Sequence, residues 1–391
     1  MDLSEKQSLW SRNFIIINLC VMFASFTNFA FIYILPVHML RIGGTNSQVG
    51  LMGAGLTIVG LVTRLTIAPK IDTWGRKPML VLGGILFAVN ALGYFLLRDS
   101  IPGIIVMRCF SGFSQGILFP VPPTIVSDIS PKDKLVDGLG YFGIASSLPA
   151  IFSPVLGLYL YENIGSFAFF TVTLITSVIS IVFGLMYKDV YVPQKKAKAV
   201  RTRFSLNSVL EVSILIPCLV SFLAIFGFSP VNNFVILCGE SRGIAAMSLF
   251  FTVHNIAIIT TRLFAGKLRR FMNSKAIIVL GLMIIGGGTV LVAFAQNTVM
   301  MMIASAIMAI GGTLYSQYLQ ADILLSVPNE RRGVANSTLM LAQDLGTGAG
   351  AATFGVISEN LGYTVTFIAA GLMTWLAIPF NFIRSRMKNA A

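Results

Sequence analysis

Charged residues are scarce in this sequence. Asp, Glu, Lys and Arg make up 11% of the 391 residues, whereas hydrophobic residues make up 55%. A soluble domain carries about 25% charged residues. A globule of this length would need a polar surface that this composition cannot supply. The scarcity of charge therefore excludes an ordinary soluble protein and predicts a surface that faces lipid.

Sequence signatures of catalysis and metal binding are also missing. There is no GxxxxGK[ST] phosphate-binding loop, so ATP hydrolysis by this chain is not expected. HExxH does not occur, and neither GxSxG nor GxGxxG occurs in a strand-to-helix context. The four cysteines lack metal-ligand spacing and are interpreted as small apolar fillers. We predict no enzyme activity, no cofactor and no metal site, with a proton or substrate gradient as the energy source.

Apolar runs of about 20 residues recur along the chain, and each can cross a bilayer core of about 30 Å. They are too long for barrel strands and lack a two-residue alternation. The first run has no small-residue cleavage site after it, which predicts a retained helix rather than a signal peptide. The sequence thus predicts an all-α membrane protein with twelve transmembrane helices, at about 13–35, 47–68, 78–97, 101–125, 138–160, 166–187, 210–233, 243–266, 276–296, 298–321, 334–358 and 362–384.

The net charge of +13 is distributed unevenly among the predicted loops. With both termini in the cytoplasm, cytoplasmic segments hold 22 of the 28 Lys and Arg residues and outer loops hold three. This asymmetry follows the positive-inside rule and fixes the predicted orientation in a plasma or inner membrane. It also explains the net positive charge, so a nucleic-acid-binding surface is not expected. The predicted partners are the lipid bilayer and a small-molecule substrate, and the chain is expected to be a monomer.

An internal repeat divides the chain in two. TRLTIAPKIDTWGRKPMLVLG begins at Thr63, and TRLFAGKLRRFMNSKAIIVLG begins at Thr261, 198 residues later. The longest polar connection lies between the two copies. We therefore expect a six-helix bundle at 1–187, a cytoplasmic linker at 188–209 and a second six-helix bundle at 210–391. Parallel repeats of this kind suit transporters whose site lies between the two halves.

The first copy contains APKIDTWGRK at residues 68–77. It resembles the loop motif G-x-x-x-D-x-x-G-R-[KR] of the major facilitator superfamily, with Ala68 in place of the first glycine. The second copy is degenerate, since Arg270 and Asn273 stand where the acid and the turn glycine would be. The resemblance implies two pseudo-symmetric helical bundles and transport by alternating access.

Two further motifs resemble the twelve-helix drug–proton antiporters of that superfamily. Arg108, followed by Gly112, Gln115 and Gly116, is similar to the arginine-containing motif of the fourth span. The fifth span matches the antiporter glycine–proline motif only in part: Gly140, Pro154 and Gly157 agree, whereas Pro149 and Ser153 replace glycines. The resemblance implies proton-coupled efflux of small amphipathic compounds.

The loop motif has a predicted gating role. Gly75 permits a tight turn between two helices, and Arg76 and Lys77 anchor the loop at the cytoplasmic face. Asp72 would pair with a cation or with a helix N-terminus. In the resembling family such a loop latches the two halves while the cavity faces outward. The alternative is an ordinary hairpin with solvated charges.

Ionisable groups inside predicted spans are functional candidates, because their burial in lipid is unfavourable. Arg64 and Arg262 are repeat-related and either extend to the interface or contact substrate. Arg108 either extends outward or acts in proton coupling. Asp344 is the one acid well inside a predicted span, where apolar surroundings favour its neutral form. It either carries the proton or stands at a helix start.

Uncharged polar residues in the spans could line a central cavity or bond neighbouring helices. His254 is a possible proton relay, and Asp128 and Asp322 are expected at the ends of their spans. The remaining cavity candidates, together with Gln115, are Asn18, Asn28, Tyr33, Tyr141, Asn255, Gln317, Gln320 and Gln343.

The function that the sequence favours is proton-coupled export of a small, partly apolar compound. Three intramembrane arginines make an anionic metabolite or a metal-chelating compound a second candidate. Uptake of a sugar or similar nutrient is a third alternative, and a non-transporting membrane sensor or scaffold is a fourth.

Overall fold

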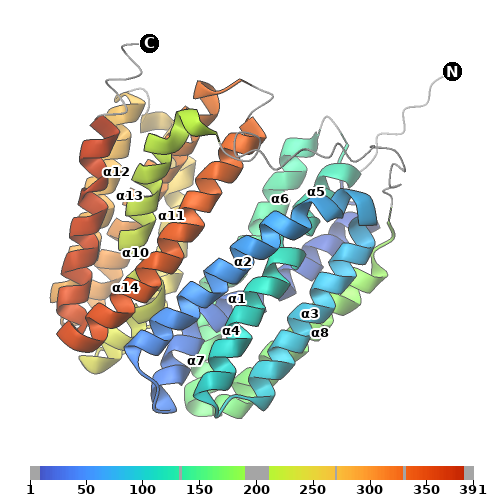
Figure 1. Ribbon diagram of the computed structural model, residues 1–391, viewed down its shortest axis with the longest axis horizontal. Helices are drawn as coiled ribbons and strands as arrows, with labels where there is room; N and C mark the ends of the chain where they lie inside the picture. The colour runs from blue at the N-terminus through green and yellow to red at the C-terminus, as the bar shows by residue number, and fades with distance from the viewer. Residues whose placement is uncertain (1–8, 132–133, 190–210, 269–270, 329–331, 383–391) are drawn as a thin grey trace. The chain divides into compact units, whose positions relative to one another are not determined.

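The computed structural model describes residues 9–131, 134–189, 211–268, 271–328 and 332–382. Within these ranges the regular structure is helical, with no strand (Figure 1). Nine helices of the described chain are long and apolar enough to cross a membrane, and one of them is the continuous stretch Val334–Phe382. The predicted spans 47–68 and 243–266 fall on two further helices that are not among the nine.

Each predicted span overlaps a helix, and prolines explain where single spans are divided. Pro120 precedes α5, and Pro149 opens α7; the missing N–H of proline suits a helix start and interrupts a helix interior. The helices are α1 (Arg12–Arg41), α2 (Asn46–Trp74), α3 (Arg76–Leu96), α4 (Ile101–Leu118), α5 (Val121–Ile129), α6 (Leu135–Ser147), α7 (Pro149–Asn163), α8 (Ser166–Met186), η2 (Val212–Ile214), α10 (Leu215–Ser241), α11 (Leu249–Leu268), α12 (Ser274–Phe294), α13 (Thr298–Ser326) and α14 (Arg332–Trp375).

Two boundaries differ from the prediction for backbone reasons. α11 begins at Leu249 rather than near 243, because Gly243 and Ala246 both have positive φ angles, 66° and 57°. α14 contains a non-helical residue, Gly362, with φ 78° and ψ 171°. This break coincides with the first residue of the predicted span 362–384, so one long element accounts for that span and for 334–358.

The chain forms two compact units. The first comprises residues 1–35 and 59–198, and the second comprises residues 36–58 and 199–391. The division falls inside α1, at Pro36, and inside α2, after Ile58. The predicted bundles at 1–187 and 210–391 remain a prediction, and most of the predicted linker lies outside the described residues.

The first unit has a core of aromatic and aliphatic side chains from α1, α3, α4 and α5. Phe14, Phe87, Leu118 and Ile125 are each at most 2% exposed. Polar side chains join α1 to α8 beside this core: the Thr27 and Thr176 hydroxyls are 2.7 Å apart. Apolar packing and interhelical hydroxyl contacts are the usual means of association for helices in lipid.

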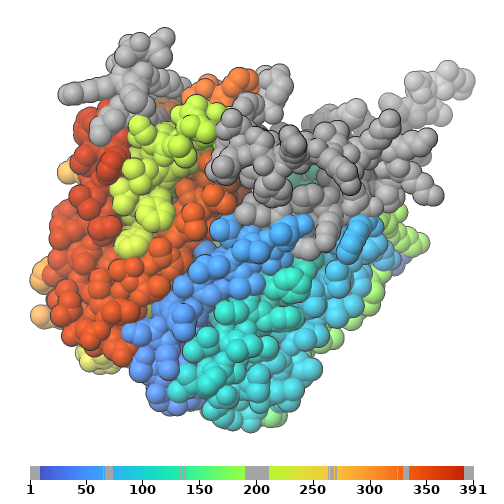
Figure 2. Space-filling view, viewed as in Figure 1, coloured from blue at the N-terminus to red at the C-terminus, as the bar shows by residue number. Residues whose placement is uncertain are grey.

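In the second unit the first half of α2 lies directly against α14 (Figure 2). A Cβ atom built on Gly50 would clash with the carbonyl oxygen of Ala351, so only glycine allows this approach. Two hydrogen bonds join the beginning of α2 to α14. The Ser47 amide donates to Glu359 at 2.8 Å, and the Tyr363 hydroxyl donates to Asn46 at 3.0 Å.

The two copies of the sequence repeat end in different turns. Gly75 has φ 98° and ψ 159°, a conformation that side chains disfavour, and it caps α3 without a side-chain bond. Asn273, its counterpart 198 residues later, has φ −74° and caps α12 by accepting a hydrogen bond from the Ala276 amide at 2.8 Å. The replacement of the turn glycine therefore comes with a different capping mechanism.

Candidate functional site

The loop motif is tied to its own unit by two aspartates. Arg76 is buried, and its Nε atom donates to Asp128 Oδ2 at 2.9 Å. The Lys77 amide donates to Asp189 Oδ2 at 3.1 Å. Asp128 is in the last turn of α5, as predicted for the end of the fourth span. The side chain of Asp72 lies outside the described residues, so its predicted partner and the gating role remain predictions.

Arg108 is buried within the first unit rather than extended to the surface. It is 4% exposed, and its charge interacts with the nearby Tyr94 hydroxyl. Tyr94 lies 2.9 Å from Ser111 Oγ, which also accepts a 2.7 Å hydrogen bond from Asn90 Nδ2. Arg108 Nη1 has no hydrogen-bond partner within the described residues. We name Asn90, Tyr94, Arg108 and Ser111 the α3–α4 cluster.

The second unit contains a cavity of ≈260 Å³ among α10, α11, α12, α13 and α14. Helical spacing explains how these residues meet. His254, Ile258 and Arg262 recur every four residues and so share one face of α11. The lining residues are Ile225, Phe228, His254, Ile258, Arg262, Ile285, Met308, Ala309, Gly312, Thr313, Tyr315, Ser316 and Gln343.

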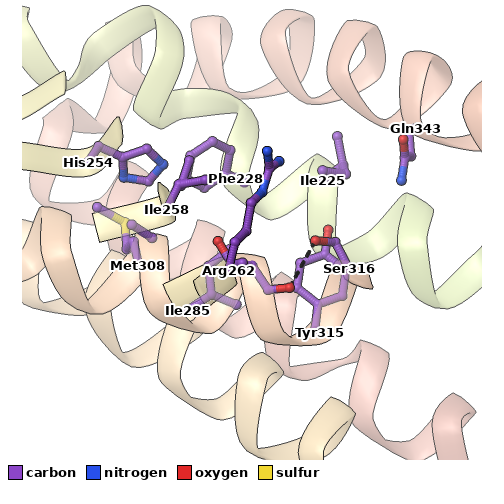
Figure 3. Close-up of a pocket in the computed structure, with 13 residues that line it drawn as sticks. Ile225, Phe228, His254, Ile258, Arg262, Ile285, Met308, Tyr315, Ser316 and Gln343 are labelled. Carbon is purple, nitrogen blue, oxygen red and sulfur yellow. Dashed lines mark hydrogen bonds between the residues drawn. The ribbon is translucent and has the colours of Figure 1, made fainter. Parts of the chain in front are cut away.

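The cavity has apolar walls and a few polar groups. In Figure 3, His254 lies toward one end and Gln343 toward the other, with the Arg262 side chain between them. Phe228, Met308 and the aliphatic residues form the walls. Arg262 is the charged group among the described lining residues, none of which is acidic. Such a surface suits a compound with an apolar body and a polar or anionic group.

Hydrogen bonding determines which ring nitrogen of neutral His254 carries the hydrogen. Its Nδ1 atom lies 3.2 Å from the carbonyl oxygen of Ser305. A carbonyl oxygen only accepts, so Nδ1 carries the hydrogen and Nε2 is an acceptor. The ring stacks on Phe228, with centroids 5.6 Å apart. His254 can therefore accept a hydrogen bond without taking up a proton.

Tyr315 is a cavity residue that the sequence did not indicate. It is 2% exposed, and its hydroxyl has no hydrogen-bond partner within the described residues. Buried polar atoms are nearly always bonded, so an unbonded one beside a cavity is a natural contact for a bound compound. Gln343, which was predicted, is held by a 3.1 Å hydrogen bond from Nε2 to Ser221 Oγ.

The structure brings Arg262, His254 and Gln343 together, but it does not gather every predicted residue. Asp344 follows Gln343 about three turns into α14, so it does not stand at a helix start. Arg64 is an exposed residue of α2. Asp322 lies inside α13, which continues to Ser326.

The remaining cavity candidates have local contacts. Asn18 and Asn255 each donate to the carbonyl four residues earlier, at 2.7 Å. Gln320 donates to Asn336 at 2.9 Å, and Tyr141 contacts the ring of Trp10. Tyr33 stacks on Phe29, and Gln317 is half-buried in α13. Among these uncharged candidates, three atoms are buried without a hydrogen-bond partner in the part of the chain that is described: Asn18 Oδ1, Asn28 Oδ1 and Gln115 Nε2.

This chain is similar in sequence to a number of known proteins, including the following three. An uncharacterised MFS-type transporter of Methanocaldococcus jannaschii is 21% identical over 359 residues, covering 88% of this chain and 92% of that protein. The staphylopine export protein of Staphylococcus aureus is 23% identical over 374 residues, 90% of each chain. The quinolone resistance protein NorA of S. aureus is 26% identical over 129 residues, 33% of each chain.

The fold can also be compared with solved structures. The crystal structure of the nucleoside transporter NupG matches 95% of this chain and all of its own, with a TM-score of 0.80 and 11% identity. This likeness confirms the predicted all-α membrane fold. The family model of the Major Facilitator Superfamily matches this chain twice, over residues 17–243 and over residues 217–390. The chain therefore belongs to the Major Facilitator Superfamily, and it is a multi-pass secondary transporter of small molecules rather than an enzyme.

Proposed function

We propose that this transporter exports small amphipathic compounds from the cytoplasm in exchange for protons, by alternating access between two helical bundles. The observation that carries the proposal is the cavity of the second unit, where Phe228 and Met308 adjoin Arg262, His254 and Tyr315. Aromatic and methionine side chains adapt to varied apolar shapes. Both termini lie in the cytoplasm in this proposal, and the chain acts as a monomer.

Asp344 is the proposed proton carrier. It follows Gln343, whose side chain lines the cavity, so a carboxyl group lies next to the substrate-facing part of α14. Apolar surroundings favour the neutral form of a carboxyl group, and access to water favours the charged form. Alternate exposure during transport would then load and release a proton.

A second candidate is export of an anionic metabolite or a metal-chelating compound. Two observations favour it. Arg262 is the charged group among the described lining residues. The staphylopine export protein is similar along 90% of both chains, whereas NorA is similar along 33%. An arginine binds a carboxylate through paired hydrogen bonds.

Proteoliposome flux of a fluorescent quinolone, which carries a carboxylate, tests the proposal. An acidic vesicle interior should accelerate quinolone entry, because protons leave as the compound enters, and a proton ionophore should abolish that acceleration. Asp344→Asn should remove the dependence on the pH gradient but leave exchange of quinolone between the two sides. Asp99→Asn is the control, since Asp99 has a side chain 78% exposed beside Arg98.

Arg262→Gln distinguishes the two substrate classes. Loss of a charge-assisted hydrogen bond of about 1.5–3 kcal/mol should raise KM for the quinolone at least tenfold. The same change should spare a lipophilic cation. Arg98→Gln is the matched control, since Arg98 Cζ lies 5.5 Å from the ring centroid of Phe95 and 5.6 Å from that of Phe167, and Arg98 is not one of the residues that line the cavity. If the flux is independent of the pH gradient, proton antiport is rejected. If none of the probes is transported, the alternative of a non-transporting scaffold is favoured.

A further inference from the structure

A groove of ≈430 Å³ runs along the beginning of α12. It lies between that helix and the helical segment 377–382, and its lining includes Lys275, Val279, Leu280, Met283, Asn381 and Phe382. None of its lining residues belongs to the cavity around His254. The groove is thus a separate feature, which the proposed transport function does not use.

One end of the groove is polar and the rest is apolar. Asn273 caps α12 and Lys275 lies in its first turn, whereas Val279, Leu280 and Met283 follow in the next two turns. The opposite wall runs antiparallel to α12. Trp375 Nε1 donates to the Met283 carbonyl at 3.2 Å, and the chain then continues to Asn381 at the polar end.

The apolar part has the length of one membrane leaflet. Ten residues separate Asn273 from Met283, which corresponds to about 15 Å along a helix. This is half of a bilayer core of about 30 Å. Met283 and Phe382 are 56% and 55% exposed, so the groove opens to the surroundings of the helices. Around a multi-pass membrane protein those surroundings are lipid.

The sequence around the groove carries positive charge without negative charge. Lys275 lines the groove itself. No acidic residue occurs from 241 to 321 or from 360 to 391. Lys267, Arg269 and Arg270 precede α12 in the sequence, and Arg384, Arg386 and Lys388 follow Phe382. With Lys275 at its polar end and an apolar wall beyond it, the groove complements an anion with a long apolar tail.

We propose that the groove binds one anionic phospholipid, with its phosphate at Lys275 and an acyl chain along Val279, Leu280 and Met283. The apolar contact retains a lipid of any headgroup, and the positive charge selects the anionic one. Each Lys or Arg near a membrane surface contributes about fivefold to the binding of anionic lipid.

Native mass spectrometry of the purified full-length protein with equimolar phosphatidylglycerol and phosphatidylcholine tests the proposal. Wild-type protein should retain phosphatidylglycerol in preference, and Lys275→Gln should reduce that preference about fivefold. Ala276→Leu fills the groove and should reduce retention of both lipids. Lys188→Gln is the control, since Lys188 is an exposed lysine at the end of α8, in the other compact unit, and this change should leave retention of both lipids unaltered.

Four outcomes would overturn the proposal. The first is equal retention of the two lipids by the wild-type protein, and the second is an unchanged preference in Lys275→Gln. The third is displacement of phosphatidylglycerol by soluble glycerol phosphate, which would indicate a site for a free anion. Retention of both lipids at wild-type levels in Ala276→Leu would place the bound lipid elsewhere.

Discussion

Tyr94 and Tyr315 are both almost fully buried, but only one of their hydroxyl groups is bonded. In the α3–α4 cluster the Tyr94 hydroxyl contacts Ser111 Oγ at 2.9 Å and Arg108. In the cavity of the second unit the Tyr315 hydroxyl has no partner within the described residues. A bonded polar group contributes to stability, whereas an unbonded one beside a cavity remains available to a ligand.

The two regions therefore have different expected roles for similar side chains. The α3–α4 cluster joins two helices through polar contacts of 2.7 and 2.9 Å. The cavity has apolar walls, and its polar groups include the unbonded Tyr315 hydroxyl. Substitutions in the cluster should change the free energy of unfolding, and substitutions in the cavity should change substrate affinity. Two residues of the cluster depart from this pattern, because Arg108 Nη1 and Asn90 Oδ1 are each buried without a partner in the described part of the chain.

The largest effect is expected for Arg108→Gln. A buried charge is unfavourable in a membrane span, so its removal should not lower the free energy of unfolding. If the unbonded Nη1 atom serves transport, flux in proteoliposomes should fall more than tenfold, since a charged hydrogen bond contributes about 1.5–3 kcal/mol. Arg98→Gln should retain flux. A parallel loss of flux and of stability, measured by unfolding in mixed micelles, would make Arg108 a structural residue.

A smaller effect is expected for Ser111→Ala. Its hydroxyl contacts Asn90 and Tyr94, so its loss leaves two buried polar groups without that partner. Unfolding should become easier by about 1–2 kcal/mol. Ser316→Ala in the cavity is the matched variant, because Ser316 Oγ bonds only locally, to the Thr313 carbonyl at 3.3 Å. It should change stability by less than about 0.5 kcal/mol; equal losses in the two variants would contradict the comparison.

Hydrophobic runs were sufficient to predict the helical class, because each run has the length of a bilayer crossing. They did not predict how helices end. The kink at Gly362 and the late start of α11 depend on single backbone angles that hydropathy does not encode. The repeat located both turns correctly, but only the structure shows that Gly75 relies on backbone conformation and Asn273 on a side-chain cap.

Candidate site residues were predictable where charge marks them. Arg108 and Arg262 stand out in apolar runs, and the structure places one in a buried cluster and the other at a cavity. Asn90 and Tyr315 carry no such mark, because their roles depend on what faces them from a neighbouring helix. The four-residue spacing of His254, Ile258 and Arg262 was a sequence signal for the cavity face of α11.

The most direct test of the comparison is the same substitution made in both regions, and it has the smallest expected effect. Tyr94→Phe removes a bonded hydroxyl and should lower the free energy of unfolding by about 0.6 kcal/mol, typical of a hydrogen bond between membrane helices. Tyr315→Phe removes an unbonded hydroxyl, so stability should be unchanged or slightly higher. If that hydroxyl contacts substrate, KM should rise about threefold to tenfold. A loss of stability in Tyr315→Phe with an unchanged KM would show that its hydroxyl is structural after all, and the two tyrosines would then be equivalent.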